Sequence, residues 1–148
     1  MKFSRLCLIW CICLLLQPGL GGAAAPQPGV VEGSLSYPSE FIPPDLTICA
    51  ENLATQKIYC TNKHLKAKKY RYKVGYKLEA PPGDYHVFAQ LPDPARYGAG
   101  YSKDYRAYYS KFVTCGMGAE CLDHTPIVVK VKSGQTVSGI DPQDWYKE

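Results

Sequence analysis

The sequence predicts an all-β protein: a single antiparallel β-sandwich of about seven short strands, held by two disulfides. Three observations lead to this prediction. Apolar and polar residues alternate in several short runs, turn residues recur at a spacing of about 8–12 residues, and four cysteines lie beyond residue 45. A length of 148 residues allows one domain, and 46% hydrophobic with 20% charged residues excludes wholesale disorder. A closed β-barrel is the alternative fold.

The expected strands follow one another as short runs between turn signals. In order, they are residues 30–37, 46–50, 57–60, 70–78, 85–91, 112–113, 126–131 and 136–140. The fourth run has the clearest two-sided pattern, which places Tyr70, Tyr72, Val74, Tyr76 and Leu78 inward and Lys69, Arg71, Lys73 and Lys77 outward. Pro81-Pro-Gly-Asp84 predicts a tight turn before the fifth run, and Ser133-Gly134 predicts another before the last.

The first 24 residues are typical of a secretory signal peptide. Lys2 and Arg5 precede an apolar run of 11 residues, 6–16, and small residues follow at 19–25. The run is too short to cross a bilayer, so we expect no transmembrane segment. A lipoprotein is disfavoured because Trp10 precedes Cys11, where a small residue is wanted; a buried N-terminal helix is the other alternative. We therefore expect an exported protein, periplasmic or extracellular.

The remaining chain divides into a Pro/Gly/Ser-rich segment, 25–44, and a sandwich domain, 45–148. From Ala25 onward there are 15 basic and 13 acidic side chains, a net charge of +2. A surplus this small requires neither nucleic acid nor a membrane surface as a partner. Nucleic acid is therefore not expected.

Four cysteines in an oxidising compartment predict two disulfides, for which three connectivities exist. Cys115 and Cys121 enclose a short loop rich in glycine and alanine, and Cys49 and Cys60 would face each other across a hairpin. The favoured pairs are therefore Cys49–Cys60 and Cys115–Cys121. The alternative is a metal site that uses these cysteines with His86 or His124, but no Cys-x-x-Cys spacing is present. We expect no metal and no cofactor.

Several segments also carry a resemblance to a known family. Residues 82–89, Pro-Gly-Asp-Tyr-His-Val-Phe-Ala, resemble the strand-entering element of carboxypeptidase regulatory-like domains. Three further segments resemble small exported bacterial proteins of this type: 33–44, 114–124 and 137–146. The resemblance implies a transthyretin-like β-sandwich and a non-catalytic module, and it implies no activity.

The stretch 63–77 holds seven Lys or Arg in 15 residues, interleaved with tyrosine. One interpretation is a cationic strip for a polyanion such as nucleic acid, an acidic glycan or lipopolysaccharide. The favoured interpretation is a strand with a solvated lysine face, which also protects a sheet edge. The best candidates for an anionic ligand are Lys66, Lys68, Lys69, Arg71 and Lys73.

The Tyr-rich stretch 97–112 is ambiguous. Its aromatic residues fall at helical spacing, but Gly98 and Gly100 argue against a helix, so we expect a long loop with a final strand near Tyr108. Tyrosines on such a loop either hold a sugar or peptide, or pack over an open end of the sandwich, and packing is favoured. The candidate ligand residues in this loop are Tyr97, Tyr101, Tyr105 and Tyr108.

The sequence gives little support for catalysis, and we expect no catalytic residue. Asp123-His124 is the only adjacent acid–imidazole pair, and neighbouring residues in an extended chain point to opposite faces. Residues 141–146 hold too few oxygen ligands for calcium, and we expect Trp145 to close the sandwich. The expectation is a non-catalytic interaction module with a protein or glycan partner. The alternative is a carbohydrate- or polyanion-binding protein, and a small hydrolase or metal-handling protein comes third.

Overall fold

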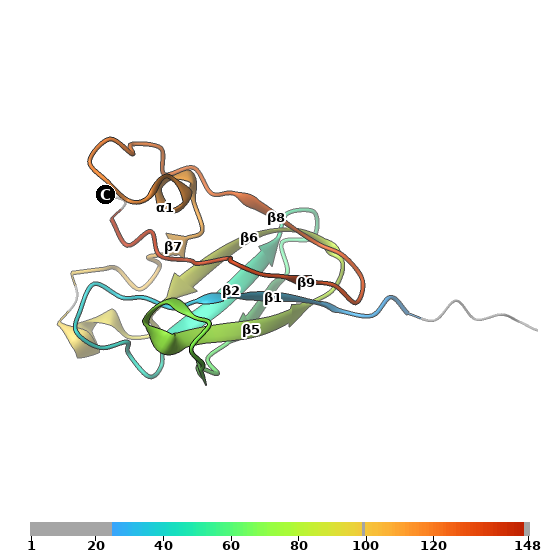
Figure 1. Cartoon of the computed structure of the whole chain (residues 1–148), viewed down its shortest axis with the longest axis horizontal. Helices are drawn as coiled ribbons and strands as arrows, with labels where there is room; N and C mark the ends of the chain where they lie inside the picture. Colours follow the sequence, from blue (N-terminus) through green and yellow to red (C-terminus); the bar gives the residue numbers. More distant parts are fainter. Residues whose placement is uncertain (1–24, 99, 147–148) are drawn as a thin grey trace, which may run out of the picture.

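A computed structural model describes residues 25–98 and 100–146, so the predicted signal peptide lies outside the described residues. Two facing sheets make up the fold (Figure 1). The two-disulfide β-sandwich predicted from the sequence is confirmed. Within the described ranges, no helix is long and apolar enough to cross a membrane.

One sheet has four strands in the order β4 (Leu65–Lys66), β5 (Val74–Ala80), β1 (Gly29–Ser34) and β9 (Thr136–Val137). β1 pairs antiparallel with β5 over its whole length and parallel with β9. The first strand expected within 30–37 is thus an inner strand of this sheet, and the sandwich begins before residue 45.

The second sheet has five strands. Its order is β3 (Ile58–Thr61), β2 (Thr47–Asn52), β6 (Gly83–Gln90) and β7 (Ala107–Tyr108), and β8 (Val128–Val131) also pairs with β6. All of these pairs are antiparallel. The predicted turn at 81–84 carries the chain from β5 in the first sheet to β6 in the second (Figure 1).

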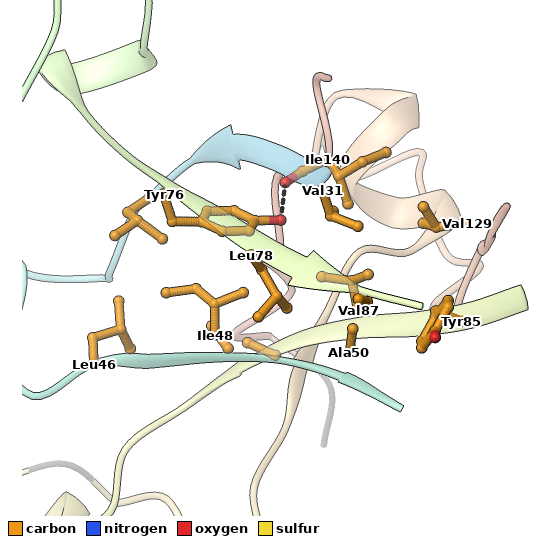
Figure 2. Packing of buried hydrophobic residues seen from close by; sticks show 14 of the residues in the cluster. Val31, Leu46, Ile48, Ala50, Tyr76, Leu78, Tyr85, Val87, Val129 and Ile140 are labelled. Atoms are coloured by element: carbon orange, nitrogen blue, oxygen red, sulfur yellow. Dashed lines mark hydrogen bonds between the residues drawn. The ribbon is translucent and has the colours of Figure 1, made fainter. Parts of the chain in front are cut away.

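The core fills the space between the sheets with apolar side chains from both. Tyr76 reaches inward from β5, where its hydroxyl donates a hydrogen bond of 2.8 Å to the Ile140 carbonyl (Figure 2). Burial raises the pKa of Tyr76 well above its ordinary value. The other large side chains that are fully buried include Leu35, Leu46, Ile48, Tyr85 and Val87. The hydrogen bond from Tyr76 to Ile140 fixes the segment after β9 against the four-stranded sheet.

One predicted strand is wrong in part. The strand expected over 70–78 begins only at Val74, because a 3₁₀ turn, η1 (Arg71–Lys73), precedes it. Tyr72 has φ 56° and Lys73 has φ 60°, so the alternation breaks and Tyr72 points outward instead of into the core. Tyr70, Tyr76 and Leu78 are buried as predicted, and Val74 is half-buried.

The run at 112–113 is not a strand but the middle of a helix, α1 (Lys111–Cys115). The amide of Thr114 donates to the Ser110 carbonyl at 3.2 Å, and Gly116, at φ 108°, ends the helix. The strand expected near Tyr108 is confirmed as β7. A second 3₁₀ turn, η2 (Pro94–Tyr97), begins the Tyr-rich loop.

Candidate functional site

A pocket of about 640 Å³ lies at the end of the sandwich where β1 ends and β5 begins. We call it the end pocket. Its walls come from four parts of the chain: residues 36–44 after β1, residues 64–74 around η1, Met117 after α1, and residues 143–146 at the C-terminal end. These segments gather on the side of the molecule drawn at the left in Figure 1. The volume is typical of a small-molecule site.

Exposed aromatic rings line the mouth of the end pocket. Phe41, Tyr72 and Tyr146 have 56%, 68% and 57% of their surface exposed, respectively. Trp145 and Tyr37 form an inner wall, with their ring centroids 5.1 Å apart in an edge arrangement. Exposed apolar side chains scattered singly are ordinary, whereas these three large rings gather around one hollow.

The polar group that distinguishes this pocket is Gln143. Gln143 is among the residues that line the pocket, and it is only 1% exposed. Neither its amide nitrogen nor its amide oxygen has a hydrogen-bond partner in the described part of the chain. Leaving a buried polar group unpaired costs about 1–3 kcal/mol. A group carried at that cost beside a pocket points to a partner supplied from the pocket.

The backbone that holds the mouth is strained at two of its residues. Tyr72 at φ 56° and Met117 at φ 59° adopt the left-handed conformation without being glycine, and both line the end pocket. The η1 turn is closed by the amide of Lys73, which donates to the Tyr70 carbonyl at 2.9 Å, and Met117 donates to the Phe112 carbonyl at 3.0 Å. Such conformations cost energy and cluster at functional sites. At η1, the conformation turns Tyr72 outward to the pocket mouth.

The structure divides the five predicted basic residues by what they contact. Lys66 lines the end pocket, and Arg71 and Lys73 flank Tyr72 in the chain. Lys69 instead forms an ion pair of 2.7 Å with Glu32, which also pairs with Lys77 at 3.3 Å. The hydrogen bond from Lys69 lowers the pKa of Glu32, which in turn raises the pKa of Lys69.

No ion pair to a described acid is formed by Lys66, Lys68, Arg71 or Lys73. Lys69 therefore anchors the sheet, whereas these four basic residues remain available to a ligand.

The Tyr-rich loop mostly packs behind the pocket rather than inside it. Tyr105 stacks on Trp145 with a centroid distance of 6.0 Å, and Tyr101 lies 5.4 Å from the same ring. The Tyr101 hydroxyl donates to the Trp145 carbonyl at 3.2 Å, and the Tyr105 hydroxyl donates to the Asp144 carbonyl at 3.4 Å. These contacts fix Trp145 as the pocket wall.

Tyr97 and Tyr108 occupy two other places. The Tyr97 hydroxyl donates to Asp45 at 2.5 Å, and this hydrogen bond raises the pKa of Tyr97. Tyr97 and Tyr101 line a separate hollow of about 470 Å³ beside Phe41. Tyr108 lies in β7 against Phe88, on the face of the sheet away from the core. The four predicted tyrosines therefore do not form one ligand surface.

The C-terminal segment that carries Gln143 and Trp145 is anchored by Asp144, which is buried. Its carboxylate accepts a hydrogen bond of 2.6 Å from the buried Ser110 hydroxyl, and His124 Nδ1 lies 2.8 and 2.9 Å from its two oxygens. Because a carboxylate only accepts, Nδ1 carries the proton. The acid that His124 meets is therefore Asp144 and not its neighbour Asp123.

Asp123 accepts hydrogen bonds of 2.9 Å from the Thr125 amide and 2.9 Å from Lys111. Hydrogen bonding by the Thr125 side chain, by Lys111 and by the Thr125 amide lowers the pKa of Asp123. All four cysteines of the described chain are oxidised, in the pairs Cys49–Cys60 and Cys115–Cys121. Across residues 25–98 and 100–146, no group of three or more His, Cys, Asp or Glu is placed to hold a metal ion.

Sequence reasoning found Lys66 but missed the rest of the pocket. Gln143, Phe41, Met117 and Tyr146 come from loops, and no periodic pattern links them in the sequence. For Gln143, the sequence offered one sign: a glutamine stands between Pro142 and Asp144 in the C-terminal segment that was expected to close the sandwich. Its burial depends on contacts with distant parts of the chain, which a local pattern does not reveal.

Comparisons with other proteins give no match: neither a protein-family model, nor a curated protein, nor a solved structure is similar enough to the chain to be matched.

Proposed function

We propose that this protein is an exported, non-catalytic β-sandwich module that binds a polar ligand in the end pocket. One observation carries the proposal: the pocket joins an aromatic mouth to a buried, unpartnered amide at Gln143. Binding sites for small ligands are mostly apolar, with a few polar groups that fix orientation. The end pocket has this composition.

The titratable groups at the pocket favour binding over catalysis. His64 uses Nε2 to contact the Leu46 carbonyl at 2.8 Å, so this nitrogen is engaged with the backbone. Glu40 and Lys66 are exposed on the pocket wall. General acid–base catalysis requires a titratable group within reach of the reacting atoms and a group that orients it. Glu40 and Lys66 have no orienting partner among the described residues, and the rest of the pocket offers aromatic rings and an amide.

Export is supported by two features of the chain. The N-terminal sequence is typical of a signal peptide, and disulfides such as Cys49–Cys60 persist in oxidising compartments. The carboxypeptidase regulatory-like resemblance agrees with a non-catalytic module. We assign the protein to the periplasm or the extracellular space on these grounds.

The proposal predicts that Gln143→Met makes the ligand-free protein more stable. Methionine has a similar length and carries no amide that must be desolvated, so the free energy of unfolding should rise by about 1 kcal/mol or more. Urea unfolding of residues 25–148, followed by Trp145 fluorescence, measures this change. Trp145 is the only tryptophan in that range.

The exposed Gln135 provides the matched control, since Gln135→Met should leave stability unchanged. A loss of stability above about 1 kcal/mol in Gln143→Met would mean that the amide has a structural partner. In that case the main support for a ligand site at Gln143 would be lost.

A further inference from the structure

The charge on the η1 side of the end pocket is one-sided. Between Glu51 and Glu79, the chain holds eight Lys or Arg and no Asp or Glu. This segment passes through the pocket wall at Lys66 and Tyr72. Two of its basic side chains, Lys69 and Lys77, are occupied by Glu32. Glu40 also lines the pocket. Lys66, Lys68, Arg71 and Lys73 nevertheless form no ion pair with a described acid, so an excess of positive charge remains on this side of the pocket, which favours a negatively charged ligand.

The aromatic mouth favours a ligand with flat, weakly polar faces. The face of an aromatic ring is electron-rich, so it attracts the positively polarised C–H groups of a sugar ring. Phe41, Tyr72 and Tyr146 stand exposed around one opening, and Trp145 lies behind them. The strain at Tyr72 keeps its ring at the mouth, where a saccharide would stack on it.

The Gln143 amide supplies the third kind of contact. A side-chain amide offers two donors and an acceptor. Neighbouring sugar hydroxyls each donate and accept, so a pair of them matches both ends of the amide at once. Because both amide atoms of Gln143 are buried, the side chain has to turn toward the pocket before such a pair can satisfy them.

Resting on the proposed function, we infer that the ligand of the end pocket is an anionic saccharide. Its ring stacks on the aromatic mouth, its hydroxyls pair with Gln143, and its acidic group contacts Lys66. Arg71, Lys73 and Lys68 lie along the chain beside Tyr72 and Lys66, where they meet the acidic groups of further sugar units. A repeating acidic polysaccharide presents its charges in such a series, and each charged contact adds to affinity.

The test compares two forms of one saccharide. A hexamer of galacturonic acid and its fully methyl-esterified form share a backbone and differ in charge. Binding to residues 25–148 is measured by Trp145 fluorescence and calorimetry at about 0.15 M salt, where weak surface attraction is screened. We expect the acid to bind and the ester to bind at least about tenfold more weakly, because the ester loses a charged hydrogen bond. A sulfated hexamer from heparin, tested in parallel, distinguishes carboxylate from sulfate as the acidic group.

Three variants connect the binding to the pocket. Lys66→Gln should weaken binding of the acid by about tenfold and leave binding of the ester unchanged. Tyr72→Asn removes the ring but tolerates the left-handed backbone, and it should weaken both forms by about five- to tenfold. Lys103→Gln is the control, because Lys103 is exposed on the Tyr-rich loop and is not part of the pocket wall; binding should not change.

Each other outcome overturns the inference. Equal binding of acid and ester, with a loss in Tyr72→Asn, means a neutral saccharide and leaves the proposed function standing. A hexaglutamate peptide is tested in parallel. If it binds more tightly than the galacturonic acid hexamer, the ligand is a peptide. If Lys66→Gln and Tyr72→Asn both bind the acid as tightly as the wild type, the acid is attracted to surface charge alone. No binding of any probe overturns the saccharide, while the stability of Gln143→Met still decides separately whether the pocket is a ligand site.

Discussion

Replacement of Asp144 by alanine is expected to lower the free energy of unfolding by about 2–4 kcal/mol. The carboxylate accepts from Ser110 and His124, and both it and Ser110 are buried. Its removal leaves the Ser110 hydroxyl unsatisfied and opens a cavity at a point where strand β7 meets the C-terminal segment. Urea unfolding followed by far-ultraviolet circular dichroism measures the loss.

Two further variants separate the hydrogen bonds from general damage. Asp144→Asn keeps the shape and can still accept from Ser110, so it should lose less stability than Asp144→Ala. Asp104→Ala removes an exposed carboxylate and should change stability by less than about 0.5 kcal/mol. If the free energy of unfolding of Asp144→Ala lies within about 1 kcal/mol of the wild-type value, the hydrogen bonds of Asp144 do not anchor the segment that carries Gln143 and Trp145.

Removal of the Cys49–Cys60 disulfide is expected to cost about 3 kcal/mol. The two cysteines are paired directly across β2 and β3, with a sequence separation of 11 and a Cα–Cα distance of 4.1 Å. The bond stabilises mainly because it restricts the unfolded chain, and the effect grows with loop length. Urea unfolding of Cys49→Ala/Cys60→Ala provides the measurement.

The second disulfide supplies the comparison. Cys115–Cys121 spans a separation of only 6, so Cys115→Ala/Cys121→Ala should cost about 2 kcal/mol. The shorter loop carries Met117 and leads to His124, so its opening should also affect the end pocket. A smaller loss for the Cys49–Cys60 pair than for Cys115–Cys121 would contradict the loop-length argument.

The inward-facing residues of the paired strands were the part of the fold that the sequence predicted well. In residues 46–50 and 85–91 every second residue is apolar, and these runs became the paired strands β2 and β6 with Ile48, Ala50, Tyr85 and Val87 in the core. Cys49 and Phe88, on the opposite face of the same strands, are buried as well. The cysteine pairs followed from short loops and a facing hairpin. In both cases the controlling interaction is local or repeats with a fixed period.

Prediction failed where long-range packing overrode the local pattern. Tyr72 fitted the alternation of its run, but the chain turns at η1 and exposes the ring. Residues 112–113 are β-prone, yet the helix α1 forms beside the Cys115–Cys121 loop. The end pocket was missed for the same reason, because Phe41, Met117 and Gln143 meet only after the sandwich has folded.

The central claim is that a saccharide reaches Gln143, and its side-chain amide signal reports this most directly. In a ¹⁵N–¹H correlation spectrum of residues 25–148, the galacturonic acid hexamer is titrated to saturation. We predict that the Gln143 amide signals shift with the same saturation curve as Trp145 fluorescence, because the amide gains hydrogen bonds. The other glutamine side chains, Gln27, Gln56, Gln90 and Gln135, serve as internal references. Gln143 signals that stay in place at saturation, while signals elsewhere shift, would contradict the end pocket as the ligand site.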